Sequence, residues 1–222
     1  MNAETWQIAR FTVLMAATAT VCVLPPAIAV GWLLARRQFA GKALLETVVS
    51  LPLVLPPVVS GLVLLWLFGR RSPVGQALDA MGIEVIFTWK AVVAAMMVIS
   101  FPLVTRSVRA GIEQVDRRYE QIAATLGASP LRILRTITLP LASRGIAAGA
   151  VLGFSRALGE FGATIMVAGA IPGQTRTIAV GIYSLVETGR EDAAWGLVVV
   201  AALLAFGAIY VSNRLMDSGA RS

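Results

Sequence analysis

Long apolar stretches alternate with short polar ones along the whole chain. The apolar stretches cover residues 11–35, 47–69, 85–105, 145–170 and 193–213. Each is long enough to cross a hydrocarbon core of about 30 Å as an α-helix that rises about 1.5 Å per residue. The pattern predicts an all-α integral membrane protein with about five transmembrane helices in a single domain, 1–222.

A sixth membrane span depends on residues 163–186. A hairpin in this region would add one span and would move one terminus across the membrane. Within it, residues 177–186 carry a helical apolar stripe that is too short to cross the bilayer. This segment therefore fits a re-entrant or interfacial helix at the outer surface better than a span.

Composition supports a membrane protein and argues against several other classes. The chain is 57% hydrophobic and 14% charged, with a mean hydropathy of +0.79. It has no histidine, and Cys22 is its only cysteine, so disulfides, histidine-based zinc sites and histidine-based triads are excluded. Cys22 lies within an apolar run and is expected to pack against other helices. No phosphate-binding loop or nucleophile motif is present, so we expect neither catalysis nor a cofactor or metal.

The net charge of +7 is better explained by membrane topology than by nucleic-acid binding. The basic residues flank apolar runs and do not form a stripe beside aromatic residues. Arg36, Arg37, Lys42 and the arginines between 106 and 144 fall on one side of the predicted membrane, which the positive-inside rule makes cytoplasmic. This places the N-terminus outside and the C-terminus inside. Cleavage after the signal-like segment 11–29 would reverse the charge bias, so the first span is predicted to be retained.

The second apolar stretch contains a cluster of helix-breaking residues. Pro52, Pro56 and Pro57 fall within six positions, and Gly61 follows. Each proline lacks an N–H and clashes with the preceding helical turn, so a straight helix is impossible here. The freed carbonyl groups must be satisfied inside a bundle or beside a cavity. Both a packing kink and a role in a membrane pathway fit this pattern.

The fourth stretch carries two ionisable residues near its middle, Arg156 and Glu160. A charge at that depth costs at least about 2.5 to 3.5 kcal/mol, so both side chains should face protein or water. Their spacing of four predicts that they share one helical face. The favoured interpretation is mutual neutralisation within the bundle. The alternative is that Arg156 attracts an anion along a pathway, with Gly162 allowing close helix packing nearby.

The longest polar interruption includes a predicted amphipathic helix at about 113–128. Val115, Tyr119, Ile122, Ala123 and Leu126 recur at helical spacing and are expected to form one apolar stripe. Three residues then predict a turn: Gly127 can adopt positive φ, Ser129 is a good N-cap, and Pro130 suits a first helical position. The segment should read helix, tight turn, helix.

This segment resembles the cytoplasmic signature of ABC importer permeases, which runs Glu-Ala-Ala, three residues, Gly, nine residues, Ile-x-Leu-Pro. Gly127 and residues 137–140 match it, whereas Gln121 and Ile122 replace the usual Glu and Ala, and Glu120 lies one position early. In that family the segment is the coupling helix that fits a groove of the ATPase subunit. The resemblance implies an ATPase-coupling role for Tyr119, Glu120, Gln121, Ile122, Ala123, Leu126, Gly127, Ala128, Leu139 and Pro140.

Three further segments look like the permeases of bacterial molybdate ABC importers. Residues 51–57 with Gly61, and residues 159–162, are also similar to sulfate and thiosulfate permeases, whereas Phe161 and the Pro-Gly-x-Thr-x-Thr run in 171–178 favour molybdate. Tungstate, sulfate and thiosulfate stay as alternative substrates. The translocation path would include Pro52, Pro56, Pro57, Gly61, Arg156, Glu160 and Gly162.

The resemblance implies a type I importer in the bacterial cytoplasmic membrane. Its partners would be a second permease copy, expected as a homodimer with a heterodimer as the alternative, two ATPase subunits and a periplasmic or lipid-anchored oxyanion-binding protein. Membrane lipid would surround it, and nucleic acid would play no part. A self-sufficient secondary anion carrier is the rival class. Such carriers usually show internal repeats and several intramembrane ionisable groups, whereas this sequence has one Arg–Glu pair and no visible repeat.

Overall fold

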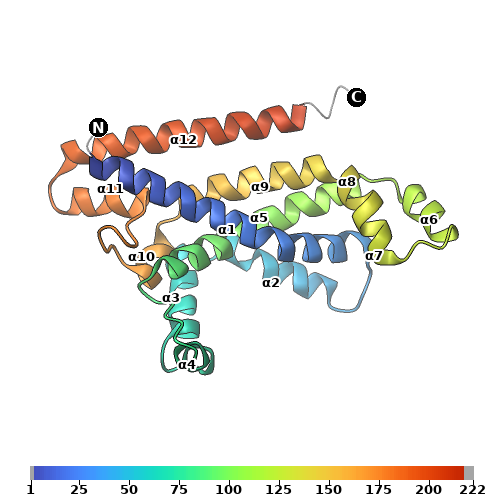
Figure 1. Ribbon diagram of the computed structural model, residues 1–222, viewed down its shortest axis with the longest axis horizontal. Helices are drawn as coiled ribbons and strands as arrows, with labels where there is room; N and C mark the ends of the chain where they lie inside the picture. Colours follow the sequence, from blue (N-terminus) through green and yellow to red (C-terminus); the bar gives the residue numbers. More distant parts are fainter. Residues whose placement is uncertain (1–2, 218–222) are drawn as a thin grey trace.

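The computed structural model describes residues 3–217, and this part of the chain contains helices and no strands (Figure 1). Three helices are long and apolar enough to cross a membrane: α1 (Ala3–Arg36), α5 (Trp89–Glu113) and α12 (Glu191–Asp217). Two bent helix pairs raise the number of candidate spans to as many as five, and no sixth is found in the described part. The fold class agrees with the sequence expectation.

The first bent pair is α2 (Lys42–Val54) and α3 (Pro57–Phe68), whose axes differ by 111°. Leu55 and Pro56 have extended backbone between them, and Pro57 takes the first position of α3. The cause is local, because a residue before proline avoids the helical region and proline cannot donate the next helical hydrogen bond. Pro52 lies inside α2 and does not end it.

The second bent pair leads from the polar region back into the bundle. The segment Pro130–Leu141 comprises α7 (Pro130–Ile133), a π-helical turn (Leu134–Thr138) and α8 (Leu139–Leu141), and it meets α9 (Ser143–Leu158) at 71°. Pro140 has no N–H to donate into a regular α-helical ladder, which fits the irregular turn before it.

The fourth apolar stretch, 145–170, is not one helix. α9 ends at Leu158, three residues intervene, and a short helix α10 follows (Gly162–Ala168). The short helix α11 (Ile178–Glu187) then occupies the region expected to be re-entrant or interfacial. Two more short helices complete the described chain: α4 (Pro73–Ala80), between the second and third predicted spans, and α6 (Arg117–Thr125).

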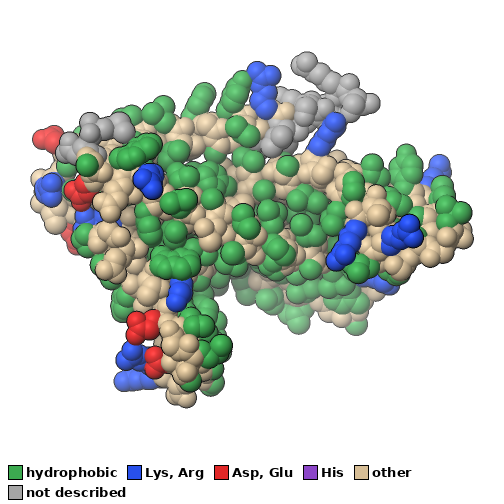
Figure 2. Space-filling model, viewed as in Figure 1, with side chains coloured by type: hydrophobic (Ala, Val, Ile, Leu, Met, Phe, Trp, Pro, Cys, Tyr) green, Lys and Arg blue, Asp and Glu red, His purple; other side chains and the backbone are tan. Residues whose placement is uncertain are grey.

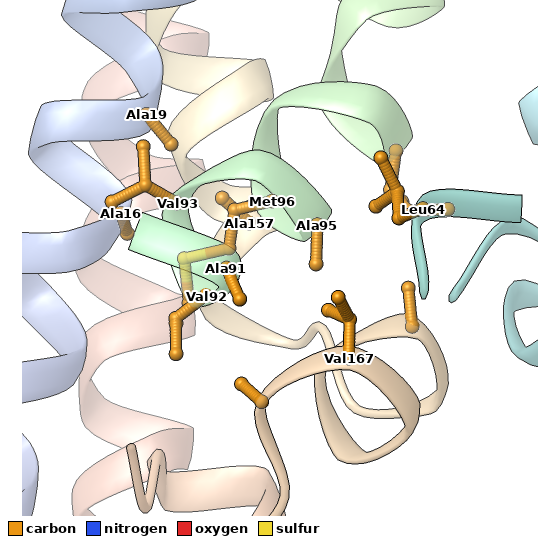
Figure 3. Close-up of a cluster of buried hydrophobic side chains, with 13 residues drawn as sticks. Ala16, Ala19, Leu64, Ala91, Val92, Val93, Ala95, Met96, Ala157 and Val167 are labelled. Atoms are coloured by element: carbon orange, nitrogen blue, oxygen red, sulfur yellow. The ribbon is translucent and has the colours of Figure 1, made fainter. Parts of the chain in front are cut away.

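Helix α5 is the centre of the bundle and packs against α1, α2, α3, α9 and α10. Figure 3 shows the cluster at its N-terminal half, where small buried side chains such as Ala16, Ala91 and Ala95 let the helices approach closely. The crossing of α5 and α9 is closer still, because a Cβ atom on Gly145 would lie 2.6 Å from the Cα atom of Gly111. Small residues are the usual means of close helix packing in membranes.

Cys22 is exposed, which corrects the expectation that it packs between helices. Its neighbour Val23 and the residues Ala16, Ala19 and Ala27 form the buried face of α1. One residue along a helix corresponds to a rotation of about 100°, so Cys22 points away from that face.

The molecule is elongated, with different elements at its two ends. In Figure 1, α6 and α7 lie at one end, α11 and the start of α1 lie at the other, and α3 with α4 projects sideways. Hydrophobic side chains cover the middle of the face shown in Figure 2, whereas charged side chains lie mainly at the α6–α7 end, at the opposite end and on α4. This distribution suits a bundle whose middle lies in lipid.

Candidate functional site

The helix–turn–helix at the polar end forms as its sequence predicts. The Asp116 side chain caps α6 by accepting a hydrogen bond of 2.9 Å from the N–H of Arg118. Gly127 has φ +81° after the helix, and the hydroxyl of Ser129 accepts from the N–H of Arg132 at 3.4 Å to start α7. Residues with a side chain, other than Asn and Asp, are disfavoured at such a φ. Glycine therefore suits this turn. The helix is shorter than the predicted 113–128.

Part of the predicted apolar stripe is exposed at this tip. Tyr119, Ile122 and Leu126 are 57%, 59% and 82% exposed; the first two lie in α6, and Leu126 follows at helical spacing as the residue that ends it. Val115 does not join them, because it precedes the helix and is buried against α5 and its neighbours. An exposed apolar face bounded by arginines is typical of a protein-binding surface.

Glu120 faces the body of the protein. The Arg36 Nε atom lies 3.1 Å from both carboxylate oxygens of Glu120, and the hydroxyl of Thr138 donates a 2.6 Å hydrogen bond to one of them. Arg36 also donates to the carbonyl oxygen of Val115 at 2.9 Å. This network joins α6 to the end of α1 and to the π-helical turn. The exposed face is therefore carried on a fixed arm, which comprises residues 117–138.

The remaining coupling candidates divide between the tip and the base of this arm. Gln121 and Gly127 are exposed at the tip, whereas Ala123 and Ala128 are half-buried. Leu139 and Pro140 lie in α8, next to the 71° bend, and are half-buried and exposed respectively. The structure therefore does not bring all of these residues onto one surface.

Glu160 is 1% exposed and lies 3.3 Å from the guanidinium of Arg156, whose side chain is 33% exposed. The two residues do not share a helical face as expected, because α9 ends at Leu158. Besides pairing with Arg156, the Glu160 carboxylate accepts a 2.7 Å hydrogen bond from the N–H of Ala163 at the start of α10. A carboxylate at a helix N-terminus is stabilising because the first N–H groups have no helical partner.

Helix α10 is packed directly onto α3 by two glycines. A Cβ atom on Gly61 would lie 2.8 Å from the Cα and carbonyl oxygen of Ala163, and one on Gly162 would lie 2.9 Å from the Cβ atom of Pro57. The structure thus brings Pro57, Gly61 and Gly162 together next to the Arg156–Glu160 pair. Pro52 lies in α2, on the other side of the bend, whereas Pro56 lies in the break directly before Pro57.

The segment 171–178 is fixed against the first helix. The N–H of Ile178 donates to the hydroxyl of Thr12 at 2.9 Å, the N–H of Ile171 donates to the hydroxyl of Thr175 at 3.1 Å, and Arg176 pairs with Glu4 at 3.2 Å. This end of the molecule is therefore ordered by contacts between the start of α1 and a loop far along the chain.

A cavity between α2 and α5 was missed by sequence reasoning. Its volume is about 730 Å³, and Ser50, Thr105 and Arg106 lie on its wall. Arg106 donates a 2.9 Å hydrogen bond to the hydroxyl of Ser50. The sequence predicts for this arginine only a place in the basic flank of a span. Residues 56 positions apart meet here, and no local pattern indicates such a meeting.

Comparison with known proteins decides the family. A family model described as "Binding-protein-dependent transport system inner membrane component" matches residues 27–221. The chain belongs to this family. It is 46% identical to the Molybdenum transport system permease protein ModB of Escherichia coli (strain K12), over 95% of this chain and 93% of the relative. The ModB protein of Haemophilus influenzae is 47% identical over 86% of this chain and 85% of its own length.

A more distant relative of this inner membrane component is the Sulfate transport system permease protein CysW of Synechocystis, 37% identical over 78% of this chain and 63% of the relative. Among solved structures, a bacterial ABC transporter that imports the acidic polysaccharide alginate matches with a TM-score of 0.71, 17% identity and coverage of 96% and 80%. The MetNI methionine ABC transporter in an inward-facing conformation matches with a TM-score of 0.67, 17% identity and coverage of 97% and 99%. The fold is that of an ABC importer permease.

Proposed function

We propose that this chain is the membrane subunit of an ATP-driven importer that carries molybdate from a binding protein into the cytoplasm. The observation that carries the proposal is its 46% identity, over nearly the full length of both chains, to a molybdenum transport permease. The sulfate permease relative is less similar and covers less of the chain, so sulfate is the second candidate substrate. Tungstate has the same tetrahedral shape and charge as molybdate and is the third.

The energy for transport would come from a separate ATPase subunit, and the permease itself would not be catalytic. The exposed face of Tyr119, Ile122 and Leu126 supports this assignment, because it offers a protein partner an apolar surface on a rigid arm. The ion pair between Arg36 and Glu120 would transmit movement of that arm to α1. Two permease copies, forming a homodimer, would enclose the path.

The Arg156–Glu160 pair would act mainly by holding the helices beside the path together. Glu160 supports this role, because one carboxylate balances Arg156 and also starts the helix that packs on α3. The contact of Gly61 and Gly162 with α10 and α3 would then form a narrow part of the route. The end that carries α6 would face the cytoplasm, with the N-terminus on the outer side.

The direct test is transport by purified components. The permease, its ATPase and its binding protein would be reconstituted into proteoliposomes, and uptake of radiolabelled molybdate would be measured with and without ATP. We expect molybdate uptake to require both ATP and the binding protein. Excess sulfate should inhibit this uptake only weakly. Uptake of sulfate in preference to molybdate would overturn the substrate assignment, and ATP-independent uptake would overturn the mechanism.

A further inference from the structure

The cavity between α2 and α5 contains a buried hydroxyl without a partner. Thr105 is 1% exposed and lines the cavity, and its Oγ1 atom has no hydrogen-bond partner in the described part of the chain. Other buried hydroxyls in the bundle donate to the carbonyl one turn earlier, as Thr12 and Thr20 of α1 and Ser100 of α5 do at 2.7–2.8 Å. A buried polar group left unpaired is costly, so the exception at Thr105 needs an explanation.

The neighbouring Arg106 carries a charge that no carboxylate balances. Its hydrogen bond goes to Ser50, and no ion pair involves it within residues 3–217. By contrast, Arg109, one turn later, pairs with Glu46 and Glu113, each at 2.8 Å. The charges of this second cluster sum to −1, whereas Arg106 retains a full positive charge on the cavity wall.

The cavity lies beside the last turns of α1 and starts at the proline break. A Cβ atom on Gly31 would lie 3.2 Å from the carbonyl oxygen of Thr105, and Gly31 precedes the end of α1 at Arg36 by about 7.5 Å of helix. Leu51 and Val54, in the last turn of α2 before the break, also line the cavity. The break between α2 and α3 separates this cavity from the contact between α3 and α10.

We propose that Arg106 and Ser50 form a transient binding site for the tetrahedral oxyanion on the cytoplasmic side of the proline break. The guanidinium has five N–H donors, and the Ser50 hydroxyl has a proton to donate, so the two side chains can bind different oxygens of one dianion. The Thr105 hydroxyl is buried in this conformation and would join them only when the wall of the cavity opens. Glu46 and Glu113 lie close by and would weaken binding. Weak binding suits a conducting site, because an ion must leave as readily as it enters. This inference rests on the proposed function.

The first test is Arg106→Gln in the reconstituted complex of permease, ATPase and binding protein. We expect molybdate uptake to fall about tenfold, the loss of roughly one charge-assisted hydrogen bond, while binding-protein-stimulated ATP hydrolysis stays within about twofold of wild type. Arg106→Lys should recover part of the uptake. Arg190→Gln removes an equal charge from an exposed loop and should leave uptake unchanged. Normal uptake by Arg106→Gln would overturn the site.

Thr105→Val separates a binding role from a structural one. Valine has nearly the same shape without the hydroxyl. If the hydroxyl were only an unpaired buried group, the variant should gain thermal stability and transport normally. If the wall of the cavity opens during transport and exposes the hydroxyl, uptake should fall severalfold although stability does not. Normal transport by a stabilised variant would exclude Thr105 from the site.

A thiol at the site gives a readout independent of transport. In a Cys22→Ser background, Ser50→Cys should react with an anionic methanethiosulfonate reagent in the nucleotide-free complex, and sodium molybdate should slow this reaction. Sodium chloride at equal ionic strength is the control. Equal reaction rates in both salts would refute the site. If the wild-type complex took up no oxyanion at all, the proposed function would fail, whereas wild-type uptake that Arg106 does not affect would refute only this inference.

Discussion

Arg36 and Glu120 are 84 residues apart in the chain, yet their side chains meet at 3.1 Å and are 8% and 18% exposed. One lies at the end of α1 and the other in α6. Because both charges are largely removed from water, the loss of one partner leaves the other buried without compensation. The pair therefore connects the exposed tip of the molecule to a helix long enough to cross the membrane.

Glu120→Ala should loosen α6 from α1, with a loss of about 2 kcal/mol in the stability of the contact. We expect ATP-driven uptake to fall at least tenfold while the protein still inserts. Arg36→Ala combined with Glu120→Ala should recover part of the loss, since no unpaired charge remains. Glu187→Gln, at an exposed position, is the control. Uptake and thermal unfolding would be measured together, and a double variant worse than the sum of the single ones would contradict the pairing.

Leu126→Ser should detach the ATPase without affecting the fold. Leu126 is 82% exposed, so its replacement should change folding stability by less than about 0.5 kcal/mol. The apolar face would nevertheless lose its most exposed member. Co-purification of the ATPase with the permease is the measurement. Met81→Ser changes a residue of similar exposure, 71%, on the α4 side and should leave co-purification intact. An unchanged yield of ATPase with Leu126→Ser would show that this face is not the docking surface.

Gly61→Ala should push α3 away from α10. The added Cβ atom would lie 2.8 Å from backbone atoms of Ala163, and overpacking of this kind costs about 1–3 kcal/mol. We expect lower thermal stability of the detergent-solubilised permease and reduced uptake. Gly207→Ala is the matched control in α12, because no atom lies within 4 Å of its added Cβ and alanine favours a helix. Equal stability of the two variants would contradict the close packing.

Two changes at Glu160 separate its charge from its capping role. Glu160→Gln keeps an oxygen for the N–H of Ala163 but leaves Arg156 without a counter-charge, whereas Glu160→Ala removes both interactions. We expect complex assembly to fall more with alanine than with glutamine, and Arg156→Ala added to Glu160→Gln should restore assembly further. Quantitative blotting of the assembled complex would measure this. Full assembly of the Glu160→Ala variant would refute a structural role.

Thiol labelling can establish the orientation. In a Cys22→Ser background, Ser129→Cys should be shielded from an impermeant thiol reagent in intact cells and should react after the membrane is opened. Gln174→Cys, an exposed position at the opposite end, should react in intact cells. Labelling of Ser129→Cys from outside would reverse the proposed topology.

The sequence by itself determined the features that depend on neighbouring residues. Apolar length indicated a helical membrane protein, the prolines at 56 and 57 indicated a break, and Gly127, Ser129 and Pro130 indicated a tight turn between two helices. Each follows from the backbone preferences of a few consecutive residues, and these preferences hold in any fold.

Only the tertiary structure decided which distant residues meet. Glu120 found its partner in Arg36, Glu160 became the cap of a helix that the sequence had merged with α9, and Arg106 met Ser50 across a cavity. Helical periodicity gives the face on which a side chain lies, but the partner of that face depends on how separate helices pack. That packing was governed here by close contacts at Gly61, Gly145 and Gly162, which involve the backbones of other helices.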